Sequence, residues 1–237
     1  MFENLSRENI GQYVEREIGR PKWRDARVKI VEVDGHRALL KDVYDRNPLF
    51  RFLVGRHLIR REFKLYKALE GVRGVPRAYR LLDKDAFLVE YIDGMPPRRY
   101  KRRVARLKNP FYKECFRLID ELHRRGLVHL DLRNKNNFLI ADGAQVYIVD
   151  FASAIRVPRW LPFRRFWVSV LGTFDRAGVL KMKQRLSRGQ VSEEDRKRIA
   201  RFERTRAIFF PHVLVLQLVR RFLRKRRKAK AKRRAGS

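Results

Sequence analysis

Two aspartates and an asparagine stand at the edges of apolar runs in GLVHLDLRNKNNFLIADGAQVYIVDFASA, residues 126–154. Asp131 and Asn136 lie in a polar stretch between the runs LVHL and FLIA, and Asp150 directly follows the next run, VYIV. Asp and Asn are common in turns, because their side chains hydrogen-bond to nearby backbone. Carboxylate and amide oxygens are also the ligands that a hard cation such as Mg²⁺ binds. The segment therefore encodes either ordinary turns or a cation site.

The spacing of these residues resembles the motifs of the protein-kinase superfamily. His129, Asp131 and Asn136 stand in HLDLRNKN, which fits the catalytic-loop pattern H-x-D-L-x-x-x-N at every defining position. Fourteen residues after Asn136, the sequence Asp150-Phe151-Ala152 is similar to the D-F-G motif. In this pattern His129 has a structural role, packing the loop.

Two charged residues upstream extend the resemblance. Lys41 ends the run RALLK, and Glu62 lies on the helix predicted after it. They match the strand lysine and helix glutamate that pair to hold ATP phosphates in protein kinases. Alone, each is an ordinary surface charge. The resemblance rests on the whole set, in this order, over roughly residues 26–154.

Within the superfamily the chain is most similar to the bacterial lipopolysaccharide kinases of inner-core sugars (the Kdo/heptose kinase group), and more distantly to RIO-type kinases. The chain is short, no A-P-E segment follows Asp150, and DRAGVLKMKQRL is predicted to begin a helix soon after it. The resemblance implies phosphoryl transfer from ATP to a hydroxyl, with Mg²⁺ as cofactor and Mn²⁺ as an alternative.

On the acceptor side, the resemblance implies a role for each matching residue. Asp131 is the expected catalytic base, which accepts the proton of the attacking hydroxyl. Arg133 stands where many protein kinases carry lysine, and its guanidinium can bind a phosphate through two hydrogen bonds. Asn136 and Asp150 are the expected metal ligands.

On the nucleotide side, the resemblance implies that Lys41 contacts the α- and β-phosphates and that Glu62 holds the lysine in place. The backbone of Glu90, Tyr91 and Ile92, just before a predicted linker, is expected to bind adenine. These five residues form the predicted ATP site.

Three departures from the kinase pattern leave alternatives open. No G-x-G-x-x-G precedes Lys41, and the hairpin KIVEVDGH offers only Gly35 to cover phosphates. Ala152 replaces the glycine of D-F-G, and Leu130 replaces the arginine of H-R-D, so an activation loop switched by phosphorylation is not expected. One alternative is a catalytically inactive scaffold; another is a protein serine/threonine kinase or a nucleic-acid-associated RIO-like kinase.

The elements that must position these residues follow from apolar periodicity and turn residues. We expect the following, in order: a hairpin from Ala26 that turns at Asp34-Gly35, a helix at about 56–69, strands within 78–83 and 86–92, a linker at 93–103, a helix at about 111–125, a hairpin at 137–151 and a helix starting at Ser192.

This order predicts the α+β class and, through the resemblance, a protein-kinase-like two-lobed fold. Residues 1–93 are expected to form a small antiparallel β-rich lobe that binds nucleotide. Residues 94–211 are expected to form a mostly helical, reduced lobe with the catalytic loop and metal site. Residues 212–237 are predicted to be a basic amphipathic or disordered tail.

The charge balance predicts an anionic partner. The chain has 59 Lys and Arg against 26 Asp and Glu, a formal net charge of +33. Nucleic acid, an acidic membrane surface and a phosphorylated substrate all satisfy this surplus. The sequence has no zinc-ligand set, helix-turn-helix signal or RNA-binding aromatic signature, so the nucleic-acid alternative rests on charge alone.

Two segments mix apolar and basic residues. From 220 to 234, eleven of fifteen positions are Lys or Arg, and Leu214, Leu218 and Phe222 form an apolar row on the helix expected before them. Such a helix either lies on an anionic membrane or packs on the second lobe. The segment 160–174 repeats the mixture, and membrane contact and core packing are both open to it.

The remaining signals concern location. The single cysteine, Cys115, is expected to be a buried structural thiol, in keeping with a reducing compartment. The N-terminal residues do not resemble a signal peptide, and the longest apolar stretch, at 208–219, is too short to span a bilayer. We expect a cytoplasmic protein, peripheral on the inner face of the cytoplasmic membrane, where a lipid-linked sugar acceptor would be found.

Overall fold

A computed structural model of the chain describes residues 2–19, 25–104, 107, 109–187 and 191–209. Two compact units are present, one spanning Met1–Gln190 and the other starting at Val191. The first unit contains every residue predicted to bind nucleotide, metal or acceptor. It is α+β, with an antiparallel sheet and a helical part, as the sequence predicts.

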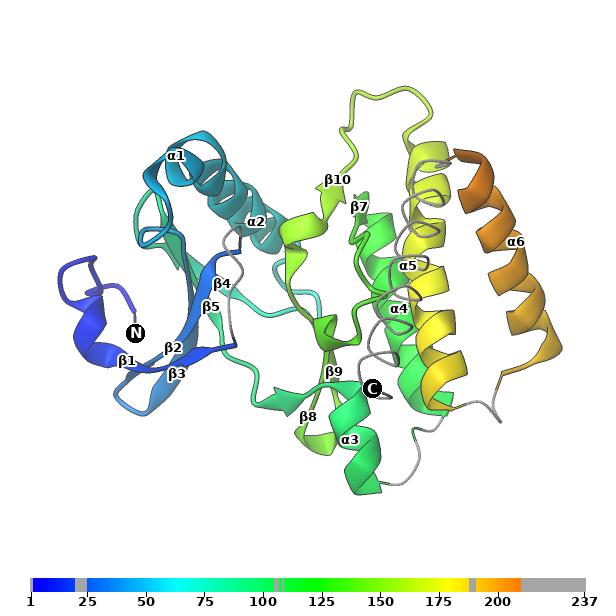
Figure 1. Cartoon of the computed structure of the whole chain (residues 1–237), viewed down its shortest axis with the longest axis horizontal. Coiled ribbons are helices and arrows are strands. Elements are labelled where there is room, and N and C mark those ends of the chain that lie inside the picture. Colours follow the sequence, from blue (N-terminus) through cyan, green and yellow to red (C-terminus); the bar gives the residue numbers. More distant parts are fainter. Residues whose placement is uncertain (1, 20–24, 105–106, 108, 188–190, 210–237) are drawn as a thin grey trace, which may run out of the picture. The chain divides into compact units, whose positions relative to one another are not determined.

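Five strands form an antiparallel sheet in the order β1-β2-β3-β5-β4 (Figure 1). They are β1 (Val14–Ile18), β2 (Arg27–Val33), β3 (His36–Asp42), β4 (Ala78–Leu81) and β5 (Ala86–Glu90). The predicted hairpin from Ala26 is β2–β3. Its turn residues, Asp34 and Gly35, both have positive φ, at 50° and 75°. A two-residue turn of this kind matches the twist of the strands that it joins.

Strand β1 is an addition to the sequence prediction. Its residues, VEREI, are mostly exposed, and it lies at the edge of the sheet. Charged residues are common on edge strands, where they discourage pairing with other chains, but they conceal the apolar alternation that reveals a strand. The first hairpin is therefore β1–β2. The connection between these strands includes residues 20–24, which lie outside the described residues.

Both faces of this sheet are covered. On β5, Phe87 and Val89 pack in the core that contains helix α2 (Arg56–Ala68). Ala86 and Leu88 face the other way and pack against N-terminal residues that include Phe2 and Leu5. Successive residues of a strand point to opposite faces, which explains why this strand is apolar at four consecutive positions.

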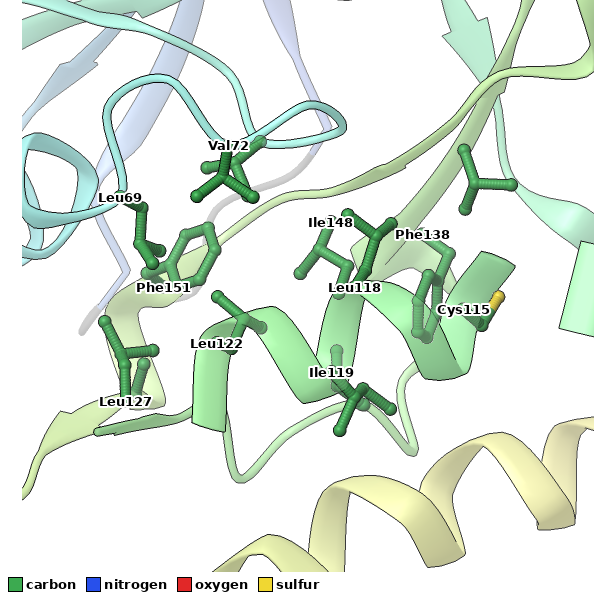
Figure 2. Close-up of a cluster of buried hydrophobic side chains, with 14 of the residues drawn as sticks. Leu69, Val72, Cys115, Leu118, Ile119, Leu122, Leu127, Phe138, Ile148 and Phe151 are labelled. Carbon is green, nitrogen blue, oxygen red and sulfur yellow. The ribbon is translucent and has the colours of Figure 1, made fainter. Parts of the chain in front are cut away.

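The helical part of the first unit is built around helix α4. The helices are α3 (Pro97–Val104), α4 (Asn109–Arg124) and α5 (Arg164–Leu186), and the short strands are β6 (Gly94–Met95), β7 (Leu127–Val128), β8 (Phe138–Ala141), β9 (Val146–Ile148) and β10 (Ile155–Arg156). Figure 2 shows Leu118 and Leu122 of α4 beside Phe138, Ile148 and Phe151, all fully buried. Helix α4 stops before Gly126, whose φ is 76°.

Cys115 lies in the same cluster on α4, and its side chain is completely buried (Figure 2). Burial raises the pKa of this thiol well above its ordinary value, since a thiolate would be desolvated there. The prediction of a buried structural thiol is confirmed.

Two element predictions were wrong in their detail. The expected linker at 93–103 contains β6 and helix α3, because Pro97 at the first helical position and the Arg and Lys that follow all suit a helix. The helix expected near DRAGVLKMKQRL is α5, which begins earlier, at Arg164. Aromatic residues in its first turns conceal the helical period.

The second unit contains helix α6 (Glu193–Phe209). Ser192 caps it as predicted: its Oγ accepts from the Asp195 N–H at 3.1 Å, and the Asp195 carboxylate accepts from the Ser192 N–H at 3.3 Å. The predicted tail, residues 212–237, lies outside the described residues. Among the helices of the described ranges, none combines the length and apolar character needed to cross a bilayer.

Candidate active site

Three charged side chains from three elements meet where the sheet, α2 and the end of β9 come together. Lys41 of β3 donates through Nζ to Glu62 Oε1 at 2.5 Å and to Asp150 Oδ1 at 3.0 Å. Lys41 and Glu62 are buried, at 8% and 4% exposure, whereas the Asp150 side chain is 49% exposed. The structure thus brings together residues that are 109 positions apart in the sequence.

The electrostatics of this cluster favour the charged forms of Lys41 and Asp150. Burial disfavours a charged ammonium, but the Glu62 and Asp150 carboxylates more than compensate and raise the pKa of Lys41 above its ordinary value. Lys41 in turn lowers the pKa of Asp150, against the opposing effect of desolvation. Asp150 is therefore ionised at neutral pH, with one side open to solvent, as a metal ligand must be.

The backbone at Asp150 has an uncommon conformation, with φ 66° and ψ 75°. Its N–H donates to the Tyr66 hydroxyl at 3.1 Å, and the Phe151 ring packs against Tyr66, with ring centroids 4.9 Å apart. A left-handed non-glycine residue persists only where its surroundings hold it. Buried Tyr66 and Phe151 thus fix the direction of the Asp150 carboxylate.

An arginine of α2 also holds the segment after Asp150. Arg61 donates to the carbonyl oxygens of Ala152 and Ala154 at 2.9 and 2.7 Å. Arg61 is adjacent to Glu62. Helix α2 is therefore linked to the segment around Asp150 in two ways, through the bonds of Lys41 and through those of Arg61. The Ala152 side chain, where kinases have glycine, is exposed.

The predicted base, Asp131, lies on the loop after β7 and is held by Asn137. The Asn137 Nδ2 donates to both the carbonyl oxygen and the Oδ2 of Asp131, each at 3.1 Å. Asn137 is buried at 3% exposure, whereas the predicted metal ligand Asn136 is exposed. The backbone N–H of Asn136 donates to Asn134 Oδ1, which closes the turn. Asn137 is thus the asparagine that the structure couples to Asp131.

The sequence analysis missed Asn137 and also Asp175 of α5, which holds the loop that carries Asp131. Its carboxylate accepts from the backbone N–H groups of His129 at 2.9 Å and Leu130 at 2.7 Å, and contacts the His123 ring at 3.0 Å. Asp175 is completely buried. The backbone of Leu130 is left-handed, with φ 66°, and the hydrogen bond from its N–H to Asp175 holds it in that conformation.

Helix α5 can approach the loop this closely because of a glycine. A Cβ at Gly178 would lie 2.8 Å from the carbonyl carbon of Leu132, closer than real side chains approach. Arg133 follows directly and is exposed. Helix α5 thus supports the loop at Leu132 and Arg133, and the Arg133 side chain is exposed.

His129 itself has the structural role that the sequence predicts. It is fully buried, and its Nε2–H donates to the Val149 carbonyl oxygen at 3.2 Å, one residue before Asp150. Burial lowers the pKa of His129 below its ordinary value, against the opposing effect of Asp175. A neutral histidine therefore ties the loop of Asp131 to the strand end that carries Asp150.

The residues expected to contact adenine connect the two parts of the first unit. Glu90 ends β5; its N–H donates to the Arg77 carbonyl oxygen at 2.8 Å, and its carboxylate accepts from the Arg77 N–H at 2.9 Å. Tyr91 is half-buried, Ile92 is buried, and the chain then enters β6, which pairs with β8. These residues thus connect β5 of the five-stranded sheet to β6, which pairs with β8.

The two missed residues left different signals in the sequence. Asn137 is the second of two adjacent asparagines, and it precedes the apolar run of β8. Asp175 is the single acidic residue between Asp150 and Glu193, and α5 presents it among apolar residues. A lone acid in a long basic and apolar segment is a signal for a buried carboxylate that binds backbone N–H groups.

Few residues in the described part of the chain could hold a metal ion. In the described ranges no group of three or more His, Cys, Asp and Glu side chains could hold a metal ion. Asp150 and Asn136 would supply two hard oxygens, and a Mg²⁺ ion held by so few protein ligands would take its other ligands from water or from phosphate groups. In the comparisons with known proteins, no protein-family model and no curated protein matches the chain.

Proposed function

We propose that the first unit is a protein-kinase-like, two-lobed phosphotransferase that uses ATP and Mg²⁺. The observation that carries the proposal is the cluster of Lys41, Glu62 and Asp150, which His129 links to the loop that carries Asp131. Phosphoryl transfer demands mainly positioning and charge neutralisation. A buried lysine held by one carboxylate, beside a second carboxylate open to solvent, suits both demands.

Each charged residue has one task in this proposal. When bound, the magnesium nucleotide supplies the phosphoryl group and neutralises part of its charge. Lys41 binds the α- and β-phosphates while Glu62 fixes its position. Asp150 ligates the metal together with Asn136, whose side chain is exposed, while the buried Asn137 holds Asp131. The backbone of residues 90–92 binds adenine.

Asp131 acts on the acceptor. Its carboxylate accepts the hydroxyl proton as the acceptor oxygen forms the new bond to phosphorus and the bond to the ADP oxygen breaks. The Asn137 amide, which donates to Asp131 Oδ2, sets the direction of the carboxylate. Arg133 is close along the chain and exposed, so it can bind an anionic group of the acceptor.

The acceptor that we propose is a lipid-linked sugar of the lipopolysaccharide core, reached from the inner face of the membrane. This part rests on the resemblance of the sequence motifs and on the net charge of +33, which favours an anionic substrate. A protein hydroxyl, or an RNA-associated acceptor as in RIO-type kinases, is the alternative for an active enzyme. An inactive scaffold is the alternative if nucleotide does not bind.

The test incubates the purified full chain with γ-labelled ATP, Mg²⁺ and either cell-envelope extract, a protein mixture or RNA. We expect label in the glycolipid fraction. Asp131→Asn should lower that transfer at least a hundredfold, whereas Asp142→Asn, an exposed turn residue, should leave it unchanged. Transfer by Asp131→Asn at the parent rate contradicts the assigned role, and label in protein or RNA alone identifies the other acceptor.

A further inference from the structure

The segment between β10 and α5 exposes aromatic side chains that a folded domain normally covers. Trp160 and Phe163 are 81% and 82% exposed, and Phe166 and Trp167 are also exposed, with ring centroids 5.5 Å apart. Single exposed apolar residues are common, but a contiguous group marks an interaction site. The sequence left core packing open for this segment, and the structure contradicts it for these four rings.

The backbone holds one of these rings outward. Phe163 has φ 55° and ψ 31°, a left-handed conformation that is uncommon for a bulky residue. The following residue, Arg164, fixes it: its guanidinium donates to the carbonyl oxygens of Val157 and Arg125 at 3.1 and 3.0 Å. A strained residue held by specific bonds, with its apolar ring in solvent, supports a functional role for this ring.

The charges around these rings are positive. Arg156, Arg159 and Arg165 are exposed, and none of them forms an ion pair with another described residue. The sequence from 151 to 174 has no Asp or Glu at all. Aromatic rings interleaved with cationic side chains are the composition that settles at the interface of an anionic bilayer.

A second apolar group lies at the start of α2, on helix α1 (Pro48–Phe50) and the π-helical turn after it (Arg51–Gly55). Leu49 and Leu53 are 69% and 71% exposed. Phe52 is also exposed, and the guanidiniums of Arg51 and Arg56 lie over its ring, 4.7 and 4.2 Å from the centroid. Both arginines also pair with the buried carboxylate of Asp85, at 4.0 and 2.8 Å, so Leu49 and Leu53 are the more exposed apolar residues of this group.

Both groups belong to the first unit, and in Figure 1 α1 and the loop before α5 both reach the upper edge of the view. Helix α2, which continues from the second group, is joined to the segment before β10 by the bonds from Arg61 to Ala152 and Ala154. The two groups therefore lie on elements that are joined to each other within one unit.

We propose that residues 156–167, together with Leu49 and Leu53, form a membrane-docking surface for bilayers with anionic headgroups. Trp160 and Phe163 enter the interfacial layer, while Arg156, Arg159 and Arg165 bind lipid phosphates. This surface is separate from the predicted contact at residues 212–237. The proposal does not depend on the phosphotransferase activity.

Charge decides between this partner and two others. The basic C-terminal residues, with eleven Lys and Arg among positions 220–234, would repel the arginines of the surface. A second copy would bring the same positive charges against each other. Duplex nucleic acid satisfies the charge but offers no apolar phase for four exposed aromatic rings.

The experiment measures binding of the full chain to vesicles of phosphatidylcholine, with and without phosphatidylglycerol, by sedimentation and tryptophan fluorescence. We expect binding to the anionic vesicles, weakened by salt. The double variant Trp160→Ser with Phe163→Ser should bind at least tenfold more weakly, and Arg159→Gln with Arg165→Gln at least fivefold more weakly. Leu53→Ser, a single change at the second group, should reduce binding at least twofold.

The matched control is Ile18→Ser, another exposed apolar residue, which lies on edge strand β1 and should leave binding unchanged. Parent-level affinity in the aromatic double variant and in Leu53→Ser would overturn the proposal, as would equal binding to neutral vesicles. Binding to duplex DNA without binding to vesicles would assign the surface to nucleic acid. A dimer that the aromatic variant abolishes, without vesicle binding, would assign it to self-association.

Discussion

Cationic side chains serve two opposite purposes in the first unit. Lys41 is buried and fixed between two carboxylates. Arg159 and Arg165 are exposed beside aromatic rings that are also exposed. A buried charge must be compensated inside the protein, whereas an exposed one is available to a partner outside.

Buried and exposed polar residues should therefore differ in how much they contribute to the stability of the fold. Removing a buried polar group leaves its former partner desolvated, which costs more than the bond itself was worth. Removing an exposed one exchanges one solvated side chain for another. Four pairs of variants, each with one buried and one exposed member of the same residue type, test this difference.

The largest effect is expected for Lys41→Met, which leaves Glu62 buried without its cation. Breaking a buried pair on one side costs about 3–5 kcal/mol of unfolding free energy. Lys64→Met, exposed on α2, should change it by less than about 0.5 kcal/mol. Chemical denaturation measures both.

The double variant Lys41→Met with Glu62→Met sharpens the same comparison. It should recover most of the lost stability, because an apolar pair of similar volume replaces the ion pair. Phosphotransfer should stay absent, because the phosphate contact is gone. Recovered activity in the double variant would refute the role of Lys41.

A smaller loss is expected for Asp175→Asn. The amide keeps one acceptor oxygen, so one of the backbone N–H groups of His129 and Leu130 loses its partner, at a cost of about 1–3 kcal/mol. Asp120, whose half-exposed carboxylate pairs with Arg176 at 2.6 Å, is the matched control. Asp120→Asn should fall within about 1 kcal/mol of the parent. Equal effects in the two variants would show that Asp175 does not hold the loop.

The adjacent asparagines give the next test. Asn137→Ala removes both bonds to Asp131 and should cost about 1–2 kcal/mol, together with most of the phosphotransfer. Asn136→Ala should cost less than about 0.5 kcal/mol, since that side chain is exposed. Denaturation and turnover are measured on both variants. Turnover should nevertheless be lost in Asn136→Ala at unchanged stability, as expected for a metal ligand, and parent-level turnover in Asn136→Ala would refute that role.

The smallest effect is a dependence on pH from His129. Because burial lowers its pKa in the folded state, its contribution to stability is complete above its ordinary pKa, about 6.5, and is lost as pH falls below that value. The slope for one group cannot exceed about 1.4 kcal/mol per pH unit. His129→Gln should flatten the decline of unfolding free energy below pH 6.5, whereas His57→Gln, an exposed residue, should not. If the unfolding free energies of His129→Gln and of the parent fall with pH in the same way, His129 is not the source of the pH dependence.

The sequence predicted those parts of the site that follow from local pattern. Apolar alternation and the Asp34-Gly35 turn located the β2–β3 hairpin and, at its end, Lys41. Helical spacing located α2 and therefore Glu62. Strand β1 and helix α3 were missed because charged and basic residues conceal their periods.

Local sequence pattern could not predict contacts between distant residues, nor which of two adjacent residues is buried. Asp175 acts on residues 45 and 46 positions away, which no spacing rule connects. Asn136 and Asn137 differ by one position, and their burial depends on how the loop closes. The composition of residues 160–167 suits a core segment and a membrane surface alike, and the surrounding fold decides whether the rings are buried or exposed.

The measurement that tests the central claim most directly is the thermal unfolding midpoint with saturating ATP and Mg²⁺. A ligand that binds the native state alone must raise it, by an increment that grows with ligand concentration. We predict such a rise for the parent, its loss in Lys41→Met and Asp150→Asn, and its retention in Asp131→Asn, which acts on the acceptor side. If ATP with Mg²⁺ gives no rise in the parent at any concentration, the buried cluster is not a nucleotide site and the fold serves as a scaffold.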